Sequence, residues 1–386
     1  MAEAAGSGGG TEALTPPAVV MNDFGRLWDD IRLEALAAVE RVGKSGWYVL
    51  GEEVKAFEHD LADEWGLAHA VTCASGLDAL ELALRSLGLR PGEKVLTTPL
   101  TAFATTLAIV RAGGVPLFCD TDDGGQLDLE GAEAALAAHP DTRFALPVHL
   151  YGHAVDAARL ERLRNTVGVI VVEDCAQAIG ARSHGRGVGS VGEASATSFY
   201  PTKNLGALGD GGAVLTDSAD LAGTLRALRD YGQVAKYDHA HIGLNSRLDE
   251  LHAAVLRDAL LPRLGAFTER RQRLAARYRA GISNPLLRVL APGDHARSVW
   301  HLFPIVVEGD PEDLRSFLAG EGIQAARHYP ALCPDQPALG DVAHVVHGDL
   351  ARARAIADHQ VSLPVHPYMT DQEADLVIEA CNRWRP

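Results

Sequence analysis

One lysine lies between an apolar-aromatic run and a glycine-rich stretch in SFYPTKNLGALGDGGAVLT, residues 198–216. The chain holds only five lysines, at positions 44, 55, 94, 203 and 236, so thirty of its 35 basic residues are arginines. Lys203 is therefore conspicuous, and it lies in a loop rather than on a charged helix face. A partly desolvated amine has a lowered pKa and can form a Schiff base with an aldehyde, so Lys203 is a candidate for carbonyl–amine exchange.

Polar residues also end several short apolar runs. Asp174 closes the run VIVVED, where a carboxylate can hold a pyridine nitrogen protonated. The Ser75-Gly76 turn opens a helical stretch, whose N-terminus offers N–H groups and a positive dipole end to a phosphate. The residues expected at one edge of the sheet are Ser75, Gly76, Thr101–Thr105, His149–Gly152, Glu173, Asp174, Gln177, Ser198 and Lys203.

Three other patterns lack the context that their usual chemistry needs. GVGSVG at 187–192 matches a dinucleotide-binding glycine pattern, but no strand precedes it and no helix follows it. Tyr200 and Lys203 have the wrong spacing for a dehydrogenase tyrosine–lysine pair. The pairs His149/His153 and His344/His347 have no clustered carboxylate or cysteine beside them, so we expect no metal site.

Short apolar runs alternate with helical stretches from residue 70 onward. This order predicts an α/β fold: a mostly parallel, seven-stranded sheet covered by helices on both faces. The predicted strands are 70–75, 94–99, 115–122, 144–152, 168–177, 196–201 and 212–217. Two helices precede them, further helices are expected at 219–232 and 247–280, and the C-terminal third predicts a smaller α+β domain.

We divide the chain into a disordered head at 1–17, a large domain at 18–262 that carries the site, and a small domain at 263–386. The formal net charge of −16 argues against partners such as nucleic acid or an anionic membrane. The five cysteines include no C-x-x-C, and no apolar stretch reaches the roughly 18 residues of a membrane span. We therefore expect a soluble, cytoplasmic protein.

Taken together, these segments resemble the DegT/DnrJ/EryC1/StrS sugar aminotransferases, which are pyridoxal-phosphate enzymes of the aspartate aminotransferase fold, fold type I. The resemblance covers nearly the whole chain, in the order of the family. It rests on SGWYVLGEEVKAFE, SGLDAL, PVHLYGHAVD, VVEDCAQAIGA, SFYPTKNLGALGDGGAVLT, NSRLDELHAAVL and SLPVHPYMTDQE.

The resemblance implies a role for each matching residue. Lys203 would carry the cofactor as a Schiff base, Asp174 would pair with the pyridine nitrogen, and Gln177 would contact the side of the ring hydroxyl. Ser75, Gly76 and Ser198 would hold the phosphate. Asn245 would reach the phosphate of the other subunit's cofactor, so the resemblance implies a homodimer with shared sites. The residues assigned to the substrate side are His149, Tyr151, Arg247, His328 and Tyr329.

The chain departs from the family pattern at three positions, one of which is Cys175 in place of an alanine, where we expect a packing role. Leu77 stands where a threonine is common, so it offers the phosphate only its backbone N–H. Where an aromatic residue usually stacks on the cofactor ring, LTAFAT has Ala102, with Phe103 one residue later. Either the loop is shifted by one position and Phe103 stacks on the ring, or the stacking contact is weaker in this chain.

The predicted function is a two-stage transamination in amino-sugar or antibiotic biosynthesis. Glutamate or glutamine would give its amino group to pyridoxal 5'-phosphate, and the resulting pyridoxamine 5'-phosphate would aminate the ketone of a nucleotide-linked keto-deoxysugar. The alternatives are a keto-cyclitol aminotransferase, a pyridoxal-phosphate sugar dehydratase and a nicotinamide-dependent sugar oxidoreductase. Dehydratases of the family have histidine at the lysine position, so Lys203 argues against that alternative.

Overall fold

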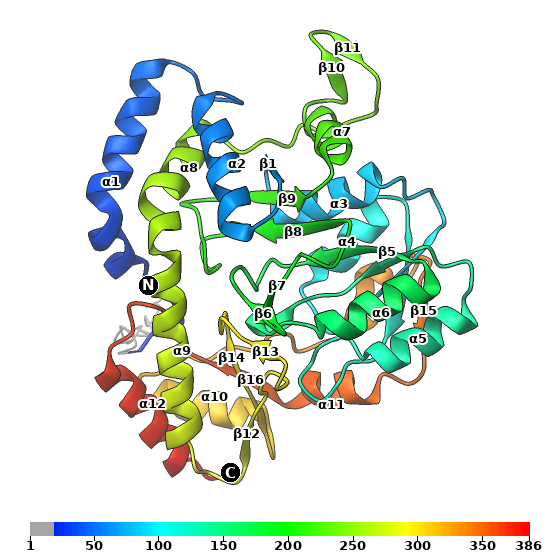
Figure 1. The fold of residues 1–386 in the computed structure, drawn as a ribbon. Coiled ribbons are helices and arrows are strands. Elements are labelled where there is room, and N and C mark those ends of the chain that lie inside the picture. The colour runs from blue at the N-terminus through cyan, green and yellow to red at the C-terminus, as the bar shows by residue number, and fades with distance from the viewer. Residues whose placement is uncertain (1–18) are drawn as a thin grey trace, which may run out of the picture.

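A computed structural model describes residues 19–386; the predicted disordered head at 1–17 lies outside this range. Eight strands form the main sheet, in the order β1-β9-β8-β5-β4-β2-β3-β15 (Figure 1). Their bounds are β1 His69–Cys73, β2 Lys94–Thr97, β3 Val115–Cys119, β4 Phe144–Leu146, β5 Ile170–Asp174, β8 Ala194–Ser198, β9 Gly212–Thr216 and β15 Val345–His347. Only β9 runs antiparallel to its neighbours, so the predicted α/β class with a mostly parallel sheet is confirmed.

The strand count differs from the prediction of seven. The eighth strand, β15, comes from the C-terminal third and pairs in parallel with the edge strand β3. A three-residue strand between two histidines has too little apolar pattern to be recognised locally, and its partner is more than 200 residues away. The predicted division of the chain at 262/263 stays a prediction, although this segment beyond it joins the large sheet.

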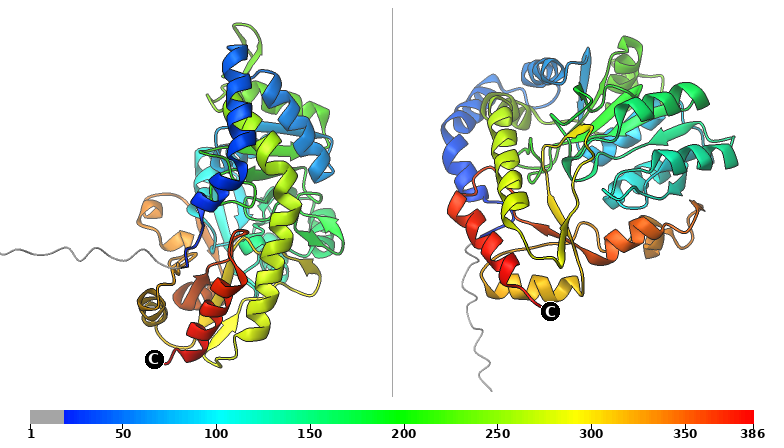
Figure 2. Two further views of the ribbon diagram at one scale, coloured as in Figure 1. Left: turned by 90° about the vertical axis from the view of Figure 1, so that its left-hand side faces the viewer. Right: turned by 60° about the horizontal axis from the view of Figure 1, so that its bottom comes forward.

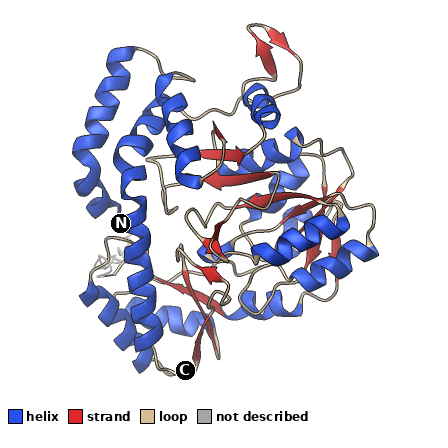
Figure 3. Ribbon diagram, in the orientation of Figure 1, coloured by secondary structure: helices blue, strands red, loops and turns tan. Residues whose placement is uncertain are grey.

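Helices cover both faces of the sheet, as Figure 3 shows. The helices of the first 230 residues are α1 Phe24–Ser45, α2 Glu52–Trp65, α3 Gly76–Ser86, α4 Phe103–Arg111, α5 Leu129–Ala138, α6 Ala157–Val167 and α7 Ala219–Arg229. One buried apolar cluster joins the sheet to α3, α4 and α7, and a second joins it to α1, α2 and α8. A third packs α5 and α6 against the sheet.

A long helical segment links the main sheet to the C-terminal part of the chain (Figures 1 and 2). It comprises α8 Glu250–Val255, a π-helical turn at 256–260, a short 3-10 turn at 261–263 and α9 Leu264–Gly281. Pro262 lies in the 3-10 turn, where the loss of its N–H is tolerated. The predicted helix at 247–280 therefore exists but is locally irregular.

The C-terminal part builds a further apolar cluster around a three-stranded antiparallel sheet in the order β12-β14-β16. Its elements are β12 Leu287–Val289, β14 Phe303–Val307, α10 Pro311–Gly320, α11 Ala351–His359, β16 Gln360–Leu363 and α12 Asp371–Arg383. Minor strands are β6 Arg182–Ser183, β7 Arg186–Gly187, β10 Gln233–Ala235, β11 Asp238–His239 and β13 Ala296–Arg297. Among the described residues, no helix combines the length and apolar character needed to cross a membrane.

Candidate active site

Lys203 lies in the loop that connects β8 to β9, beyond the carboxyl end of β8. A backbone hydrogen bond from Lys203 N to Tyr200 O, 2.8 Å long, closes a turn that holds the side chain in place. The side chain is half-buried, and no carboxylate of the described residues is within ion-pair distance of its amine. Burial lowers the pKa of Lys203 to about 8, although the charge of Asp174 opposes this shift. An appreciable fraction of the amine is therefore neutral near neutral pH.

Asp174 is the last residue of β5, and its side chain is only 5% exposed. Its Oδ2 accepts a hydrogen bond of 2.8 Å from the Thr105 hydroxyl, and its Oδ1 accepts one of 3.1 Å from the N–H of Ala176. Burial raises the pKa of Asp174, whereas these hydrogen bonds and the charge of Lys203 act against the rise. The site thus holds the Asp174 side chain in a fixed orientation, and a bound cation would stabilise its charged form.

Ser75, Gly76 and Ser198 lie together where the N-terminus of α3 meets the end of β8. The Ser75 hydroxyl caps α3 by accepting from Asp78 N at 3.1 Å, and the first N–H groups of the helix, those of Gly76 and Leu77, have no intrahelical partner. A Cβ on Gly76 would lie 2.5 Å from Ser198 Cβ, and one on Gly212 would lie 2.4 Å from Ser75 O. Glycine is thus required for this close approach, which forms a cradle for a small anionic group.

The substitution Gly76→Ala is expected to weaken binding of a phosphate-bearing cofactor at least about tenfold, because the added methyl group separates Ser198 from the helix N-terminus. Titration of the cofactor-free protein, followed by absorbance, measures this change. Gly223→Ala is the matched control, since a Cβ on Gly223 in α7 meets nothing within 4 Å. Equal affinity of the two variants would rule out the cradle.

Gln177, Tyr151 and the 328–329 segment form one hydrogen-bonded group. Gln177 accepts from Tyr151 N at 2.7 Å and donates to the Tyr329 hydroxyl at 3.2 Å, while the Tyr151 hydroxyl donates to His328 O at 2.7 Å. These bonds attach His328 and Tyr329, from the C-terminal part of the chain, to the sheet edge. The Tyr151 hydroxyl is thus occupied within the protein, which corrects its assignment to the substrate side.

His149 is also not available to a substrate, which corrects a second assignment. Its Nδ1 accepts from Val155 N at 3.0 Å, so Nε2 carries the proton and donates to Glu173 at 2.9 Å. Glu173 lies on the face of β5 opposite to Asp174, as strand alternation requires. The histidine therefore has a structural role.

The glycine-rich stretch GVGSVG binds a carboxylate of the protein itself. The N–H groups of Gly189, Val191 and Gly192 donate to Glu173 at 2.8–3.0 Å. Burial raises the pKa of Glu173, but the hydrogen bonds from His149 and from this stretch outweigh it, and the net pKa lies below its ordinary value. This arrangement gives the stretch a structural role and argues against the dinucleotide interpretation.

Glu173→Gln is expected to destabilise the protein by about 2–4 kcal/mol, because the amide cannot accept all four hydrogen bonds. Since the folded-state pKa is lowered, this stabilisation is present above the ordinary carboxyl pKa and is lost as the pH falls through the folded-state value. Urea unfolding at neutral and acidic pH measures both effects. The exposed Glu133→Gln serves as the control, and an equal effect of both changes would contradict the argument.

Phe103 does not point to the place that the predicted stacking requires. As the first residue of α4, it packs against a buried cluster of Phe118, Cys333 and Leu339. Ala102 is the N-cap residue of α4, and its carbonyl oxygen accepts a hydrogen bond of 3.1 Å from the N–H of Thr105, the residue whose hydroxyl binds Asp174. The packing of Phe103 in this cluster favours Ala102 at the ring position, and the choice between the two residues stays a prediction.

Asn245 and Arg247 lie on the extended segment before α8. Asn245 is exposed, and Arg247 pairs with Asp230 at 2.6 Å and covers the Tyr231 ring at 5.1 Å. Neither lines the pockets that border Lys203 in a single chain. Their proposed roles therefore depend on a second chain.

Two residues beside Lys203 were not found from the sequence. His301 lies in the loop before β14 and is 7% exposed, and Arg271 of α9 is 4% exposed. Only a polar position before an apolar run marked His301, which is a weak signal. The residues around one pocket at Lys203 are Met21, Asn22, Tyr200, Thr202, Lys203, His301, Leu302, Ala326, His328, Tyr329 and Val365.

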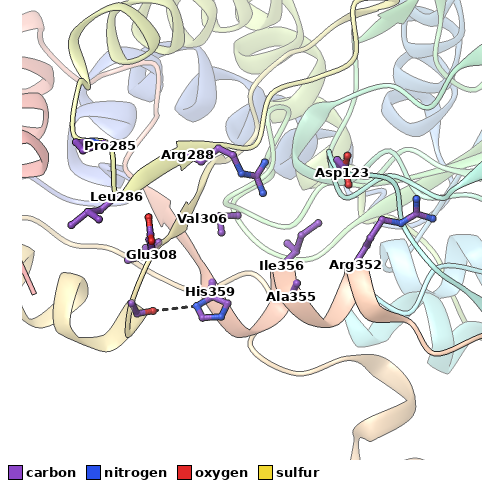
Figure 4. Close-up of a pocket in the computed structure, with 12 residues that line it drawn as sticks. Asp123, Pro285, Leu286, Arg288, Val306, Glu308, Arg352, Ala355, Ile356 and His359 are labelled. Carbon is purple, nitrogen blue, oxygen red and sulfur yellow. Dashed lines mark hydrogen bonds between the residues drawn. The ribbon is translucent and has the colours of Figure 1, made fainter.

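A separate pocket lies between β12, β14 and α11 and contains none of the predicted site residues (Figure 4). Arg288 and Arg352 flank it, with Asp123 near Arg352. Arg352 is already paired with Asp128. The chemistry-bearing residues thus gather around Lys203.

Comparison with known proteins gives a family match over most of the chain. A model of the DegT/DnrJ/EryC1/StrS aminotransferase family matches residues 29–382. The dTDP-3-amino-3,4,6-trideoxy-alpha-D-glucose transaminase of Streptomyces venezuelae is 42% identical over 95% of this chain and 96% of its own length. The UDP-N-acetyl-3-dehydro-alpha-D-glucosamine 3-aminotransferase of Acidithiobacillus ferrooxidans is 37% identical over 92% of this chain and 95% of its own length.

A crystal structure also resembles the chain closely. DesV of S. venezuelae, solved in complex with a ketimine intermediate, superposes with a TM-score of 0.91 at 42% identity and covers 96% of this chain and 99% of its own. Both the sequence and the fold therefore match along nearly the full length.

Proposed function

The chain belongs to the DegT/DnrJ/EryC1/StrS aminotransferase family and is a pyridoxal-phosphate-dependent sugar aminotransferase of amino-sugar biosynthesis; from this premise we propose its substrates and the roles of its residues. The amino group moves from glutamate or glutamine to the ketone at position 3 of a nucleotide-linked keto-deoxysugar. Both relatives described above are named for an amino group at position 3 of a nucleotide-linked sugar. The observation that carries the proposal is the partly desolvated amine of Lys203 beside the buried carboxylate of Asp174.

The residues present fit the cofactor on structural grounds. The cradle at Gly76 and Gly212 is closed to any Cβ, which suits a phosphate at the N-terminus of α3. Asp174 is a buried acid with a raised pKa that gains from a cation. Pyridoxal phosphate, when bound, supplies an aldehyde that accepts an amino group and a protonated ring that delocalises an electron pair.

Lys203 has two tasks in this proposal. Its amine attaches covalently to the cofactor at rest, which the lowered pKa favours because the attacking amine must be neutral. When the donor amino acid replaces it, the freed Nζ would take the proton from the donor's α-carbon and pass it to the carbon of the cofactor that carried the aldehyde oxygen.

The remaining residues hold the cofactor and orient the substrate. Asp174 keeps the proton on the ring nitrogen, with Thr105 fixing the carboxylate. Gln177 reaches the side of the ring hydroxyl, and Ser75 and Ser198 join the N–H groups of Gly76 and Leu77 around the phosphate. In this proposal Ser75, Gly76, Leu77 and Ser198 bind the phosphate, and His328 and Tyr329 face the substrate.

The chain is further proposed to act as a homodimer with shared sites. Exposed apolar side chains cluster on α1, in the loop after it and around the β10–β11 hairpin, and a second copy would cover them. They are Phe24, Trp28, Leu33, Leu36, Val39, Trp47, Tyr48, Val49, Tyr231, Val234, Tyr237 and Ile242. Asn245 and Arg247, at the base of the hairpin, would then reach the partner's cofactor and substrate.

Substrate assays in two stages test the proposed reaction. Incubation with glutamate or glutamine should consume the aldehyde absorbance, and with glutamate it should release 2-oxoglutarate. Adding nucleotide sugars with a ketone at position 3 should then restore the absorbance, whereas 4-keto sugars and keto-cyclitols should not. Restoration by only a 4-keto sugar or a cyclitol would contradict the proposed acceptor, and lack of reaction with both donors would contradict the proposed donor.

Complementation between two inactive variants tests the shared sites. Asn245→Asp should repel the partner's cofactor phosphate and inactivate the enzyme, as Lys203→Ala should. The two variants are mixed in equal amounts, unfolded and refolded together, so that half of the dimers contain one chain of each kind. Each of these heterodimers has one intact site of its two, so about a quarter of the wild-type activity should return. A mixture that stays as inactive as its components would show that each site comes from one chain.

A further inference from the structure

Two histidines line the same pocket as Lys203. Hydrogen bonds to their Nδ1 atoms determine where each ring carries its proton, and the two rings are in different tautomers. His301 lies in the loop before β14, and His328 follows α10. Each uses Nδ1 within the protein, which leaves Nε2 as the ring nitrogen available to the pocket. The chemistry of each Nε2 therefore depends on the partner of the corresponding Nδ1.

Asn204 determines the tautomer of His301. The Asn204 Nδ2 group donates to Val299 O at 3.3 Å, so its Oδ1 is the atom that faces His301 Nδ1 at 3.1 Å. An amide oxygen only accepts, so Nδ1 of His301 must carry the proton. The Nε2 atom of His301 is consequently an acceptor, and it has no hydrogen-bond partner among the described residues.

Ser362 determines the tautomer of His328. Its hydroxyl oxygen accepts from Gln360 Nε2 at 2.6 Å, and the orientation of that amide is fixed because Gln360 Oε1 accepts from His328 N at 2.7 Å. Ser362 is fully buried and its hydroxyl has no other acceptor among the described residues, so its proton is donated to His328 Nδ1, 2.9 Å away. His328 Nε2 therefore carries a proton and is a donor.

Only one of the two rings can accept a hydrogen bond from an ammonium group. Burial, and then the charges of Lys203, Arg271 and His328, lower the pKa of His301 well below its ordinary value, so its ring stays neutral. Burial and Lys203 likewise lower the pKa of His328 to about 4. A neutral acceptor and a neutral donor thus lie at the same pocket.

We propose that His301 is a positioning residue for Lys203: its Nε2 accepts a hydrogen bond from the Lys203 ammonium group and holds it while the amine carries the donor's proton. Asn204, the next residue in the chain, keeps the ring in the required tautomer. The inference rests on the proposed function only for the origin of that proton. His328, as a donor, cannot replace His301 in this role.

The other titratable and charged groups around these residues come from several elements. Those that line the two pockets at Lys203 or influence its charge are Asp23, Asp174, Tyr200, Arg271, His328, Tyr329, His366 and Tyr368. Because none of them changes in the variants below, their contribution to the pKa of Lys203 is common to all samples.

The test measures the pKa of Lys203 itself in full-length protein, without cofactor and in the pyridoxamine phosphate form. Lysine labelled with ¹³C at Cε gives only five signals, and Lys203→Arg identifies the one from position 203. Removing the acceptor with His301→Leu should lower this pKa by about one unit, because the ammonium form loses a hydrogen bond. His301→Gln keeps an acceptor and a group that can bind Asn204, and should restore the pKa to near the wild-type value.

Kinetics give a second readout. His301→Leu should lower kcat for the glutamate half-reaction at least about tenfold with little change in KM, whereas His301→Gln should recover most of kcat. Should the leucine variant not fold, Asn204→Ala provides the measurement, because loss of the tautomer control should lower the same pKa.

An unchanged pKa of Lys203 in His301→Leu would overturn the inference. A raised pKa would also overturn it, since that sign is expected if His301 were a cation. Borohydride labelling separates this failure from that of the proposed function. A cofactor adduct at Lys203 with an unchanged pKa defeats only the role of His301, whereas an absent adduct defeats the proposed role of Lys203.

Discussion

Lys203→Ala is expected to lower turnover at least about a thousandfold while leaving the fold intact, since the side chain is both the covalent attachment point and the proton carrier in the proposed reaction. The wild-type protein should be yellow, and borohydride reduction followed by peptide mass spectrometry should find the cofactor on residue 203. The variant should show neither property. A small added amine such as methylamine should restore part of its activity by replacing the missing base.

Lys44→Ala is the matched control for this variant. Lys44 is an exposed lysine of α1 that pairs only with Glu40, one turn earlier, and its loss should leave turnover unchanged. A Lys203→Ala protein that transaminates at the wild-type rate, or a reduced adduct on one of the other four lysines, would refute the assignment of the catalytic amine.

Asp174→Asn is expected to lower kcat by roughly a hundredfold to a thousandfold, because a neutral amide cannot hold the proton on the ring nitrogen. The amide is nearly the same size, and its oxygen can still accept from the Thr105 hydroxyl, so the site should keep its shape apart from the loss of the 3.1 Å bond from Ala176 N–H. The measurement is the single-turnover rate with glutamate. Asp123→Asn, at an exposed aspartate, is the control.

The same substitution should stabilise the cofactor-free protein. Burial raises the folded-state pKa of Asp174 above its unfolded value, so the folded state binds this proton more tightly. As the pH rises through the folded-state pKa, a buried charge without an ion-pair partner forms and stability falls. Urea unfolding near neutral pH should therefore give Asp174→Asn a higher free energy of unfolding than wild type, and a lower value would contradict the argument.

The local pattern was sufficient for most of the fold because it records which faces of each element are buried. Seven of the eight strands of the main sheet coincide with short apolar runs, and the Ser75-Gly76 turn marks the start of α3. The strand β15 could not be found this way, since only its pairing with β3 makes it a strand. The irregular turn at 256–260 likewise leaves no signal in the spacing of apolar residues.

Some of the predicted site residues likewise followed from local pattern, whereas the place of others depended on tertiary contacts. Asp174, Gln177, Ser198 and Lys203 follow strands, so the rule that parallel strands end at one edge brings them together. His149 and Tyr151 also follow a strand, yet Glu173 and His328 occupy their polar atoms. The sequence left open whether Phe103 or Ala102 faces the cofactor ring, and the structure packs Phe103 against Phe118, Cys333 and Leu339.

By itself the sequence determined the α/β class and indicated Lys203 and Asp174 as the proposed reactive amine and its acidic partner, because burial pattern and residue chemistry are local properties. Only the tertiary structure decided the pKa values of the site residues and which ring nitrogens donate or accept hydrogen bonds. The lowered pKa of Lys203 requires burial, and the acceptor at His301 requires Asn204 and Val299, which lie almost one hundred residues apart in the chain. Desolvation and tautomer depend on contacts between distant segments, and no local pattern encodes them.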